Sequence, residues 1–132
     1  MALIKRFEDL ECWKESRNLV NEIYIVCEQG KFKRDSDTRS QLKRAALSIM
    51  NNIAEGFGRY SNKEFIRFLE FSQSSALEVK SMLYVIEDQN YVKKETLNGI
   101  KRHLDNTLSL TLGLIRYLRN NPSKKGAPRA KQ

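Results

Sequence analysis

The stretch NKEFIRFLEFSQSSALEVKSMLYVIEDQN, residues 62–90, carries the clearest helical repeat of the chain. Its apolar and small residues recur in alternating steps of four and three, a seven-residue repeat typical of a long helix packed along one seam. The stretch therefore predicts one long helix, with Ser72 and Ala76 as a small-residue waist where a neighbour can come close. The seam residues are Phe65, Leu69, Ser72, Ala76, Val79, Leu83 and Ile86.

Three other segments carry a helical period, at about residues 9–28, 38–57 and 94–120. Two prolines and six glycines in 132 residues are few chain breakers, which favours long helices over strands and turns. Short connections place consecutive helices side by side and antiparallel. We therefore predict an all-α fold: an antiparallel up-down four-helix bundle over residues 1–120, with a basic, disordered tail over residues 121–132.

Helix faces and ends follow from the same pattern. Gly30 is the expected stop after the first helix, and Ser36 or Asp37 is the expected cap of the second. The apolar face of the first helix includes Leu10, Trp13, Val20, Tyr24 and Cys27, and that of the second includes Leu42, Ala46, Ile49, Ile53 and Phe57.

The connection GFGRYSNKE, residues 56–64, is explained as a corner between two helices. Gly58 can take the left-handed conformation that ends a helix, and Ser61 and Glu64 have the spacing of a capping box. Gly56 suits a close approach of backbone to a neighbouring helix. The pattern does not fit a phosphate-binding loop, because the two glycines are only G-x-G apart and follow a helix rather than a strand.

The helix before this corner carries a polar face that folding propensity does not require. Ser48, Asn51, Asn52 and Glu55 belong to it, and Glu55 stands four residues before Arg59, the order that favours an exposed ion pair. Asparagine is a poor residue for a helix interior. Two interpretations stay open: a solvated face, or a polar network inside the bundle or between subunits that fixes register.

Basic residues gather around the second helix, the corner and the tail. The net charge is +8, and residues 120–132 hold four basic residues and no acid. Such a balance favours polyanions, nucleic acid above all, with a solvated charged rim as the alternative. Tyr60 is the aromatic best placed to stack on unpaired bases. The candidate nucleic-acid-binding residues are Arg39, Lys43, Arg44, Arg59, Tyr60, Lys63, Arg67, Lys124, Lys125, Arg129 and Lys131.

The third and fourth helices carry more apolar surface than one seam needs. On the third helix, Ile66, Leu77 and Tyr84 form a second stripe about a quarter-turn from the seam. Extra apolar stripes on a small bundle predict burial against another subunit, and a wide core face in a monomer is the alternative. We take Ile66, Leu77 and Tyr84 as candidate oligomer contacts.

The sequence offers no catalytic or metal-binding set. His103 is the single histidine, and we expect it at the surface or in a groove rather than as a ligand. One histidine and two distant cysteines do not make a zinc site, and no Cys–His neighbourhood provides a nucleophile with its base. We therefore predict a protein that is not an enzyme and has no catalytic residues, metal or cofactor.

The two cysteines and the hydropathy bear on the compartment. Cys12 and Cys27 are fifteen residues apart on one predicted helix, about 22 Å along its axis, and cannot bridge each other. No apolar run is long enough to span a bilayer, and no signal peptide is recognisable. We expect a cytoplasmic protein with free thiols and no membrane partner.

Several of these motifs together resemble a known family. The chain opens with Phe7-Glu8-Asp9-Leu10, RAALSIMNNIAEGFGR spans residues 44–59, and FIRFL follows at 65–69. This combination resembles the four-helix-bundle family encoded in intervening sequences of bacterial 23S ribosomal RNA genes, over nearly the whole chain to about Leu118. The family signature falls on Arg44, Ser48, Asn52, Glu55, Gly56, Gly58 and Arg59, for which the family supplies no settled role.

The resemblance implies a bacterial bundle that assembles as a homopentamer, with a basic surface and no enzymatic activity. The family is similar in fold to the accessory variability determinant proteins of diversity-generating retroelements, which bind a reverse transcriptase and nucleic acid. Two hypotheses follow: an oligomer that binds RNA or DNA, and a scaffold that recruits a partner enzyme such as a reverse transcriptase. The chain departs from the family at Met50-Asn51, where a proline commonly precedes the asparagine.

Overall fold

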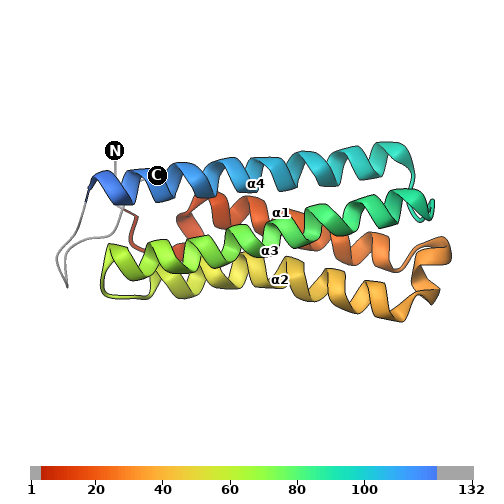
Figure 1. Ribbon diagram of the computed structural model, residues 1–132, viewed down its shortest axis with the longest axis horizontal. Coiled ribbons are helices and arrows are strands. Elements are labelled where there is room, and N and C mark those ends of the chain that lie inside the picture. Colours follow the sequence, from red (N-terminus) through yellow and green to blue (C-terminus); the bar gives the residue numbers. More distant parts are fainter. Residues whose placement is uncertain (1–3, 122–132) are drawn as a thin grey trace.

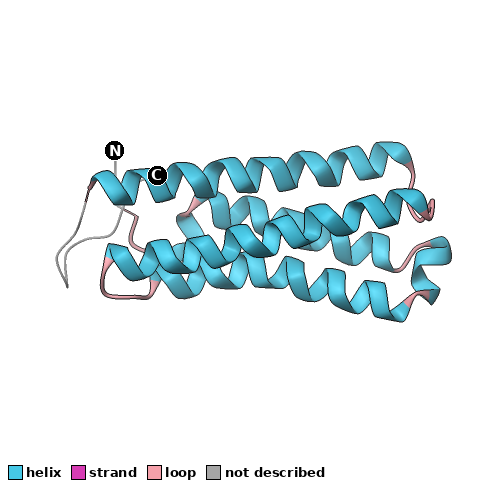
Figure 2. Cartoon of the chain, viewed as in Figure 1, coloured by secondary structure: helices cyan, strands magenta, loops and turns pink. Residues whose placement is uncertain are grey.

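The computed structural model describes residues 4–121, and every regular element within them is helical (Figures 1 and 2). The four predicted helices are confirmed, and their ends differ from the expected ones by at most two residues. Short 3-10 helices, Phe7–Asp9 and Gly30–Arg34, precede α1 and α2. The long helices are α1 (Glu11–Cys27), α2 (Ser36–Phe57), α3 (Asn62–Asp88) and α4 (Lys94–Asn120).

The four helices form an up-down-up-down bundle. The chain runs back and forth along one axis, so each helix is antiparallel to the next (Figure 1). Helix α1 packs against α2 and α4, and α3 packs against the same two, while within residues 4–121 no Cα atoms of the diagonal pairs come within 8 Å of each other. One end of the bundle therefore holds the α2–α3 connection and the last turn of α4; we call it the corner end.

The seam predicted on α3 is the centre of the core. All seven of its residues are buried, as the alternating steps of four and three require. At the waist, the buried Ser72 hydroxyl donates a hydrogen bond to the Ile49 carbonyl of α2 at 2.9 Å. A small side chain thus lets two helices approach and satisfies its own polar atom at the contact.

Tyr24, predicted on the apolar face of α1, is instead 40% exposed. Its ring lies at the edge of the α1–α2 contact, where the Lys43 ammonium is 4.8 Å from the ring centroid. The cation attracts the face of the ring, so this aromatic residue covers a charged group rather than filling the core.

The cap of α2 is Asp35, not Ser36 or Asp37 as expected. Its Oδ1 accepts the Thr38 backbone N–H at 3.1 Å, and its Oδ2 accepts the Tyr91 hydroxyl at 2.9 Å. These bonds, the one from Thr38 foremost, hold the pKa of Asp35 below its usual value. Tyr91 in turn stacks on Phe32, with ring centroids 4.8 Å apart. Tyr91, 56 positions away in the sequence, therefore helps to hold Asp35 in place as the cap of the helix.

Two residues with positive φ lie in the connections at the other end of the bundle. Gly30 has φ of 51° but is not the stop of α1 that we expected: the helix ends at Cys27 with Glu28 as its cap, and Gly30 begins the 3-10 helix Gly30–Arg34. Asn90 has φ of 56° after α3. There the N–H of Tyr91 bonds the Ile86 carbonyl and the N–H of Asn90 bonds the Glu87 carbonyl, the two bonds of a Schellman motif.

A helix that crosses a bilayer needs a long apolar run. Within residues 4–121, no helix combines the length and the apolar character that crossing a bilayer would need.

Candidate nucleic-acid interface at the corner end

Gly56 fixes the geometry of the corner. A Cβ on this glycine would lie 2.7 Å from Phe68 Cβ, 2.9 Å from the Phe65 ring and 3.2 Å from the Phe65 carbonyl oxygen. The predicted close approach is therefore confirmed: the last turn of α2 presses against the first two turns of α3. This contact fixes the position of the first turns of α3 relative to the end of α2.

The conformation predicted for Gly58 is wrong. The residue has φ of −77° and ψ of −4°, in the right-handed region. Its N–H bonds the carbonyls of Ala54 and Glu55, so α2 ends through a tightened last turn instead of a left-handed residue. The chain becomes extended only at Ser61, whose Oγ accepts the Glu64 N–H at 3.2 Å and caps α3 as predicted.

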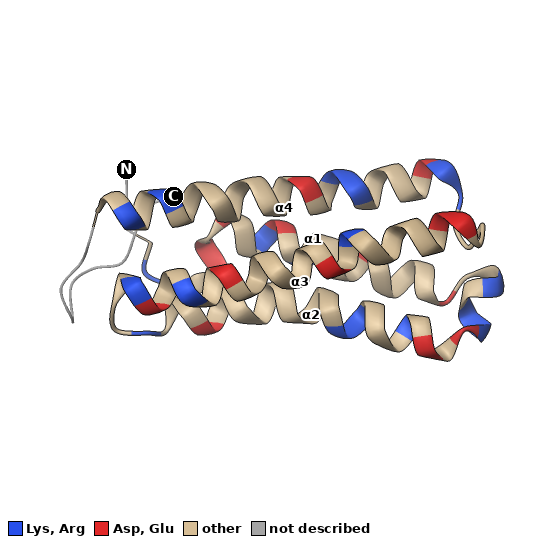
Figure 3. Ribbon diagram, viewed as in Figure 1, with Lys and Arg blue, Asp and Glu red and all other residues tan. Residues whose placement is uncertain are grey.

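The structure divides the predicted basic residues between the two ends of the bundle (Figure 3). Arg39 and Lys43 lie far from the corner and bind the Glu28 carboxylate, at 3.0 and 3.6 Å. The Arg39 hydrogen bond is the main cause that lowers the pKa of Glu28. These two cations join the end of α1 to the start of α2, which leaves them less available to a ligand.

Four cations lie together at the corner end: Arg59, Lys63, Arg67 and Arg119, here called the corner cations. All four are exposed. The Arg59 guanidinium lies over the Phe68 ring at 4.5 Å from its centroid rather than against Glu55, and that of Arg67 lies over Phe71 at 5.6 Å. Aromatic rings thus orient both guanidinium groups.

Two further residues of the predicted set, Tyr60 and Arg44, differ in their distance from the corner cations. Tyr60, the predicted stacking residue, is 66% exposed beside them. Arg44 is exposed farther along α2 and contacts the Ser40 hydroxyl at 3.3 Å. Arg119 was missed as a site residue because α4 is remote from the corner in sequence; the antiparallel order of α3 and α4 is the signal that could have found it.

A hollow of about 590 Å³ opens among three of the corner cations, Lys63, Arg67 and Arg119, between the start of α3 and the end of α4. Ile66 and Leu118 form its apolar wall. Glu70, on its rim, binds Arg119 at 3.1 Å. Polar residues of the hollow include Asn62, Lys63, Arg67 and Arg119. We call it the corner hollow.

Asn62 is the one of these residues that is buried, with 6% of its surface exposed. Its Nδ2 donates to the Asn121 carbonyl at 3.0 Å and so ties α3 to the end of α4. Its Oδ1 is also buried and accepts no hydrogen bond from any residue between 4 and 121. Sequence reasoning gave Asn62 no functional role.

Two residues of the polar face of α2 are hydrogen-bonded to each other, and the other two are exposed to solvent. Ser48 is its hub: the Asn52 amide donates to the Ser48 carbonyl at 2.8 Å and contacts its Oγ at 3.0 Å, and Ser75 of α3 donates to the same Oγ at 2.9 Å. Asn51 and Glu55 are exposed beside a shallow hollow of about 390 Å³. A polar network therefore exists between α2 and α3.

The three candidate oligomer contacts differ in exposure. Ile66 is half-buried and belongs to the corner hollow. Leu77 and Tyr84 are 58% and 60% exposed on α3, and the Lys101 ammonium lies 6.0 Å from the Tyr84 ring centroid. Apolar side chains thus remain exposed along the C-terminal half of α3.

Some predicted site residues cannot be placed. Lys124, Lys125, Arg129 and Lys131 of the tail lie outside residues 4–121, which are those that the structure describes.

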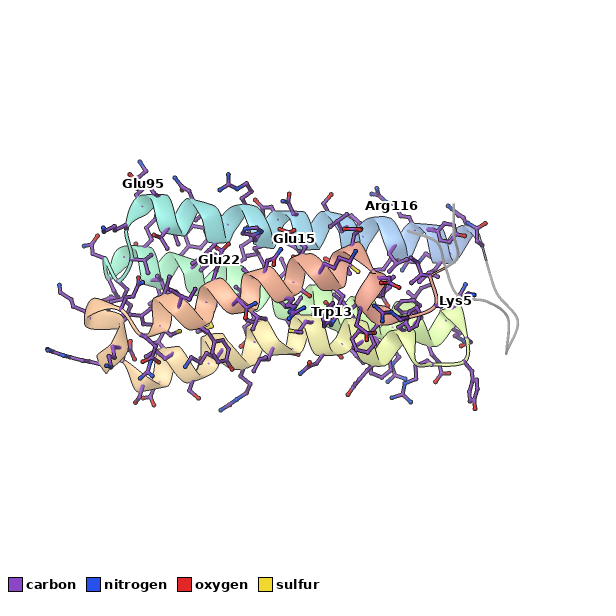
Figure 4. The ribbon with its side chains drawn as sticks, turned by 180° about the vertical axis from the view of Figure 1, so that it is seen from behind. Lys5, Trp13, Glu15, Glu22, Glu95 and Arg116 are labelled. Atoms are coloured by element: carbon purple, nitrogen blue, oxygen red, sulfur yellow. The ribbon has the colours of Figure 1, made fainter. Side chains whose placement is uncertain are left out.

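His103 of α4 is partly exposed, with 28% of its side chain accessible, and contacts two residues of α1 that were not anticipated as its partners. Its Nε2 lies 2.7 Å from Glu22 Oε1, and its Nδ1 contacts the Glu15 carboxylate. Figure 4 shows both glutamates on α1, about two turns apart along the helix. Their spacing of seven is the signal that could have placed them on a common face. The arrangement ties α1 to α4.

The thiols and the acids build no further site within the described chain. Cys12 and Cys27 are both buried and form no disulfide, and burial is the main cause that raises the pKa of the Cys27 thiol. Across residues 4–121, no group of three or more His, Cys, Asp and Glu side chains is arranged to hold a metal ion.

The fold and the polar corner define the class of this protein: an all-α four-helix bundle without strands in its described part. A family model described as 23S rRNA-intervening sequence protein matches residues 8–113. Because this match covers most of the 132 residues, the chain belongs to the 23S rRNA-intervening sequence protein family, as its motifs suggested.

A solved structure agrees with the fold. The crystal structure of a protein of unknown function from the S23 ribosomal protein family of Bacteroides thetaiotaomicron superposes with a TM-score of 0.73. The two chains are 20% identical, and the match covers 80% of this chain and 95% of the other. At this identity the likeness supports the fold alone. A comparison with curated proteins found no match.

Proposed function

We propose that this protein is a non-enzymatic, cytoplasmic bundle that binds RNA, or nucleic acid more broadly, through the corner cations. The observation that carries the proposal is the convergence of Arg59, Lys63, Arg67 and Arg119 at one end of the bundle, from the corner and from two helices. Two acids lie near this group: Glu70 lines the hollow and binds Arg119, and Glu64 is exposed in the first turn of α3.

Chemistry supports an RNA ligand over a small anion alone. Lysine and arginine neutralise phosphates and release counterions, while a guanidinium held flat on a ring offers a plane on which unpaired bases can stack. The guanidinium groups of Arg59 and Arg67 lie over the rings of Phe68 and Phe71, and Tyr60 is exposed near them. Phosphate contact and base stacking are thus available on one surface.

Binding of a fluorescently labelled structured RNA, measured by anisotropy across a salt series, tests the proposal. Affinity should fall steeply with salt, since each phosphate contact adds about 0.7–0.9 to the slope of log K against log salt concentration. The variant Lys63→Gln/Arg67→Gln/Arg119→Gln should lower this slope by about two to three. Binding that is weak and insensitive to salt would contradict the proposal.

A matched control is available at the opposite end of the bundle. Lys31, Lys33 and Arg34 are three exposed cations of the connection before α2. Changing all three to glutamine removes the same net charge from the same chain. If this variant loses as much affinity as the corner variant, then net charge rather than the corner end governs binding.

Homo-oligomerisation, as a pentamer, is part of the same proposal. The exposed Leu77 and Tyr84 support it, because apolar patches on a small bundle favour contact with another subunit. Light scattering should give a mass five times that of the 15.4 kDa chain. Leu77→Glu should shift the mass toward the monomer, whereas Ile25→Glu, at a residue of α1 that is 60% exposed, should not. A monomer at micromolar concentration would refute this part.

The same apolar surface supports a second candidate function, a scaffold that recruits a partner enzyme such as a reverse transcriptase. Phe71, Leu77 and Tyr84 are all more than two-fifths exposed along α3, and clustered aromatics are frequent anchors of protein interfaces. A pull-down with the bundle as bait discriminates the two functions: a partner that Leu77→Glu loses and the corner variant keeps would favour the scaffold.

A further inference from the structure

Positive charge converges on the corner hollow from two helices. Lys63 and Arg67 come from α3, and Arg119 comes from α4. Glu70 is the one acid that lines the hollow, and Arg119 neutralises it at 3.1 Å. Three cations against one acid leave the hollow with an excess of positive charge, which favours an anionic group there.

The N-terminus of α3 adds to this charge. Ser61 takes the N–H groups of Glu64 and Phe65, through its Oγ at 3.2 Å and its carbonyl at 3.1 Å. The N–H groups of Asn62 and Lys63 also belong to the first turn, in which no carbonyl of the helix itself can accept them. A 27-residue helix thus directs its positive end toward the hollow.

Asn62 adds to the hollow a hydrogen-bond acceptor that has no partner in residues 4–121. Its Nδ2 is engaged with the Asn121 carbonyl at 3.0 Å, so a flipped amide would set oxygen against oxygen. The group without a partner in residues 4–121 is therefore the acceptor Oδ1 of a side chain that is 6% exposed. A bare anion such as phosphate offers mainly acceptors, whereas the edge of a nucleobase offers N–H donors.

Apolar wall, positive rim and buried acceptor are the complement of a nucleotide. Ile66, half-buried above the buried Leu118, gives the base an apolar surface, and a volume of about 590 Å³ is in the range of small-ligand sites. A terminal phosphate monoester carries about −1.5 to −2 charges, against one for a diester within a strand. Three cations and a helix N-terminus in one hollow match the higher charge.

We propose that the corner hollow binds the phosphorylated terminal nucleotide of an RNA strand. The inference rests on the proposed function and specifies its ligand. The phosphate lies among Lys63, Arg67 and Arg119 at the start of α3, and the base lies against Ile66. A base N–H donates to Asn62 Oδ1, which binding has to uncover because this atom is buried without the ligand. The remaining corner cation, Arg59, contacts the strand outside the hollow.

Affinity for one short single-stranded RNA with different ends tests the inference on the full chain. Three forms are compared by anisotropy with an internal label: a 5′-phosphate, a 3′-phosphate, and hydroxyls at both ends. We expect one phosphorylated form to bind about tenfold tighter than the dihydroxyl form, through its charge-assisted hydrogen bonds. The form that binds more tightly identifies which end of the strand the hollow takes.

Two single substitutions locate the effect. Arg67→Gln should abolish the preference for the phosphorylated end. Arg116→Gln removes one exposed cation of α4 from the same end of the bundle. The Arg116 side chain points outward from the bundle (Figure 4) and does not line the hollow, so this variant should keep the preference. Both sites are exposed, and thermal melting of each variant checks that the fold is intact.

The outcomes separate the inference from the function on which it rests. Salt-dependent binding that is equal for all three RNA ends overturns the terminal-phosphate site and leaves RNA binding in place. A preference that Arg67→Gln and Arg116→Gln retain equally overturns the assignment to the hollow. Absence of binding by all three forms refutes the proposed function itself and the inference with it.

Discussion

Replacing Gly56 by alanine is the most direct test of the corner. The new Cβ would stand 2.7 Å from Phe68 Cβ and 3.2 Å from the Phe65 carbonyl oxygen. Carbon atoms in good contact are about 3.5–4.0 Å apart, so α2 and α3 would have to separate by about 1 Å. Neither contacting atom can rotate away, because one is a Cβ and the other belongs to the backbone of α3.

The size of the effect follows from two opposing terms. Overpacking a tight contact costs about 1–3 kcal/mol, and the rigidity of both contacting atoms places Gly56→Ala at the upper value. Alanine in a helix interior is better than glycine by about 1 kcal/mol. The net loss of unfolding free energy is therefore about 2 kcal/mol, which lowers the urea midpoint by roughly 1 M.

Gly113 provides the matched control. It lies inside α4, is exposed, and a Cβ added there would meet no atom within 4 Å. Gly113→Ala should therefore gain about 1 kcal/mol from helix propensity alone. Urea unfolding at one fixed protein concentration measures both variants, since oligomerisation makes stability concentration-dependent. An equal gain for Gly56→Ala would refute the close approach at the corner.

Three further predictions concern the packing of the helices. A double-mutant cycle of His103→Ala and Glu15→Ala should show a coupling of about 1–2 kcal/mol in urea unfolding, because their contact joins α1 to α4; additive losses would argue against the link. The lowered pKa of Asp35 contributes stability above the pKa of the unfolded chain, and this stability is lost as pH falls through the folded value; urea midpoints should show this loss in the native chain and a smaller one in Asp35→Asn. Cys27, buried and with a raised pKa, should react with iodoacetamide only as the protein unfolds; rapid labelling of the native chain would contradict its burial.

The fold could be read from the sequence because its deciding signals are periodic and local. The α3 seam needs only a count of steps, and every one of its seven residues is buried. The Gly56 contact was also accessible, since glycine weakens a helix interior and is therefore expected there mainly where a neighbouring backbone comes close. The conformation of Gly58 was not, because a tightened last turn and a left-handed residue both end a helix and both accept glycine.

The candidate site was harder to predict because it is assembled across the bundle. Nearness in sequence grouped Arg39 and Lys43 with the corner, yet a helix of 22 residues carries them to the opposite end, where Glu28 binds them. Arg119, by contrast, reaches the corner from α4. A helix rises about 1.5 Å per residue, so charges that are close in the sequence of one helix are spread along its axis and do not form a compact patch.

The polar face of α2 divides into a structural part and a part that is open to a ligand or a subunit. Ser48 and Asn52 are committed to the contact with Ser75 of α3, and a partly buried polar link of this kind favours one register of two helices over its neighbours. Asn51 and Glu55 are exposed instead. Since they take no part in that link, substitutions there should leave unfolding unchanged. A loss of affinity or of assembly in such a variant would therefore report on function alone.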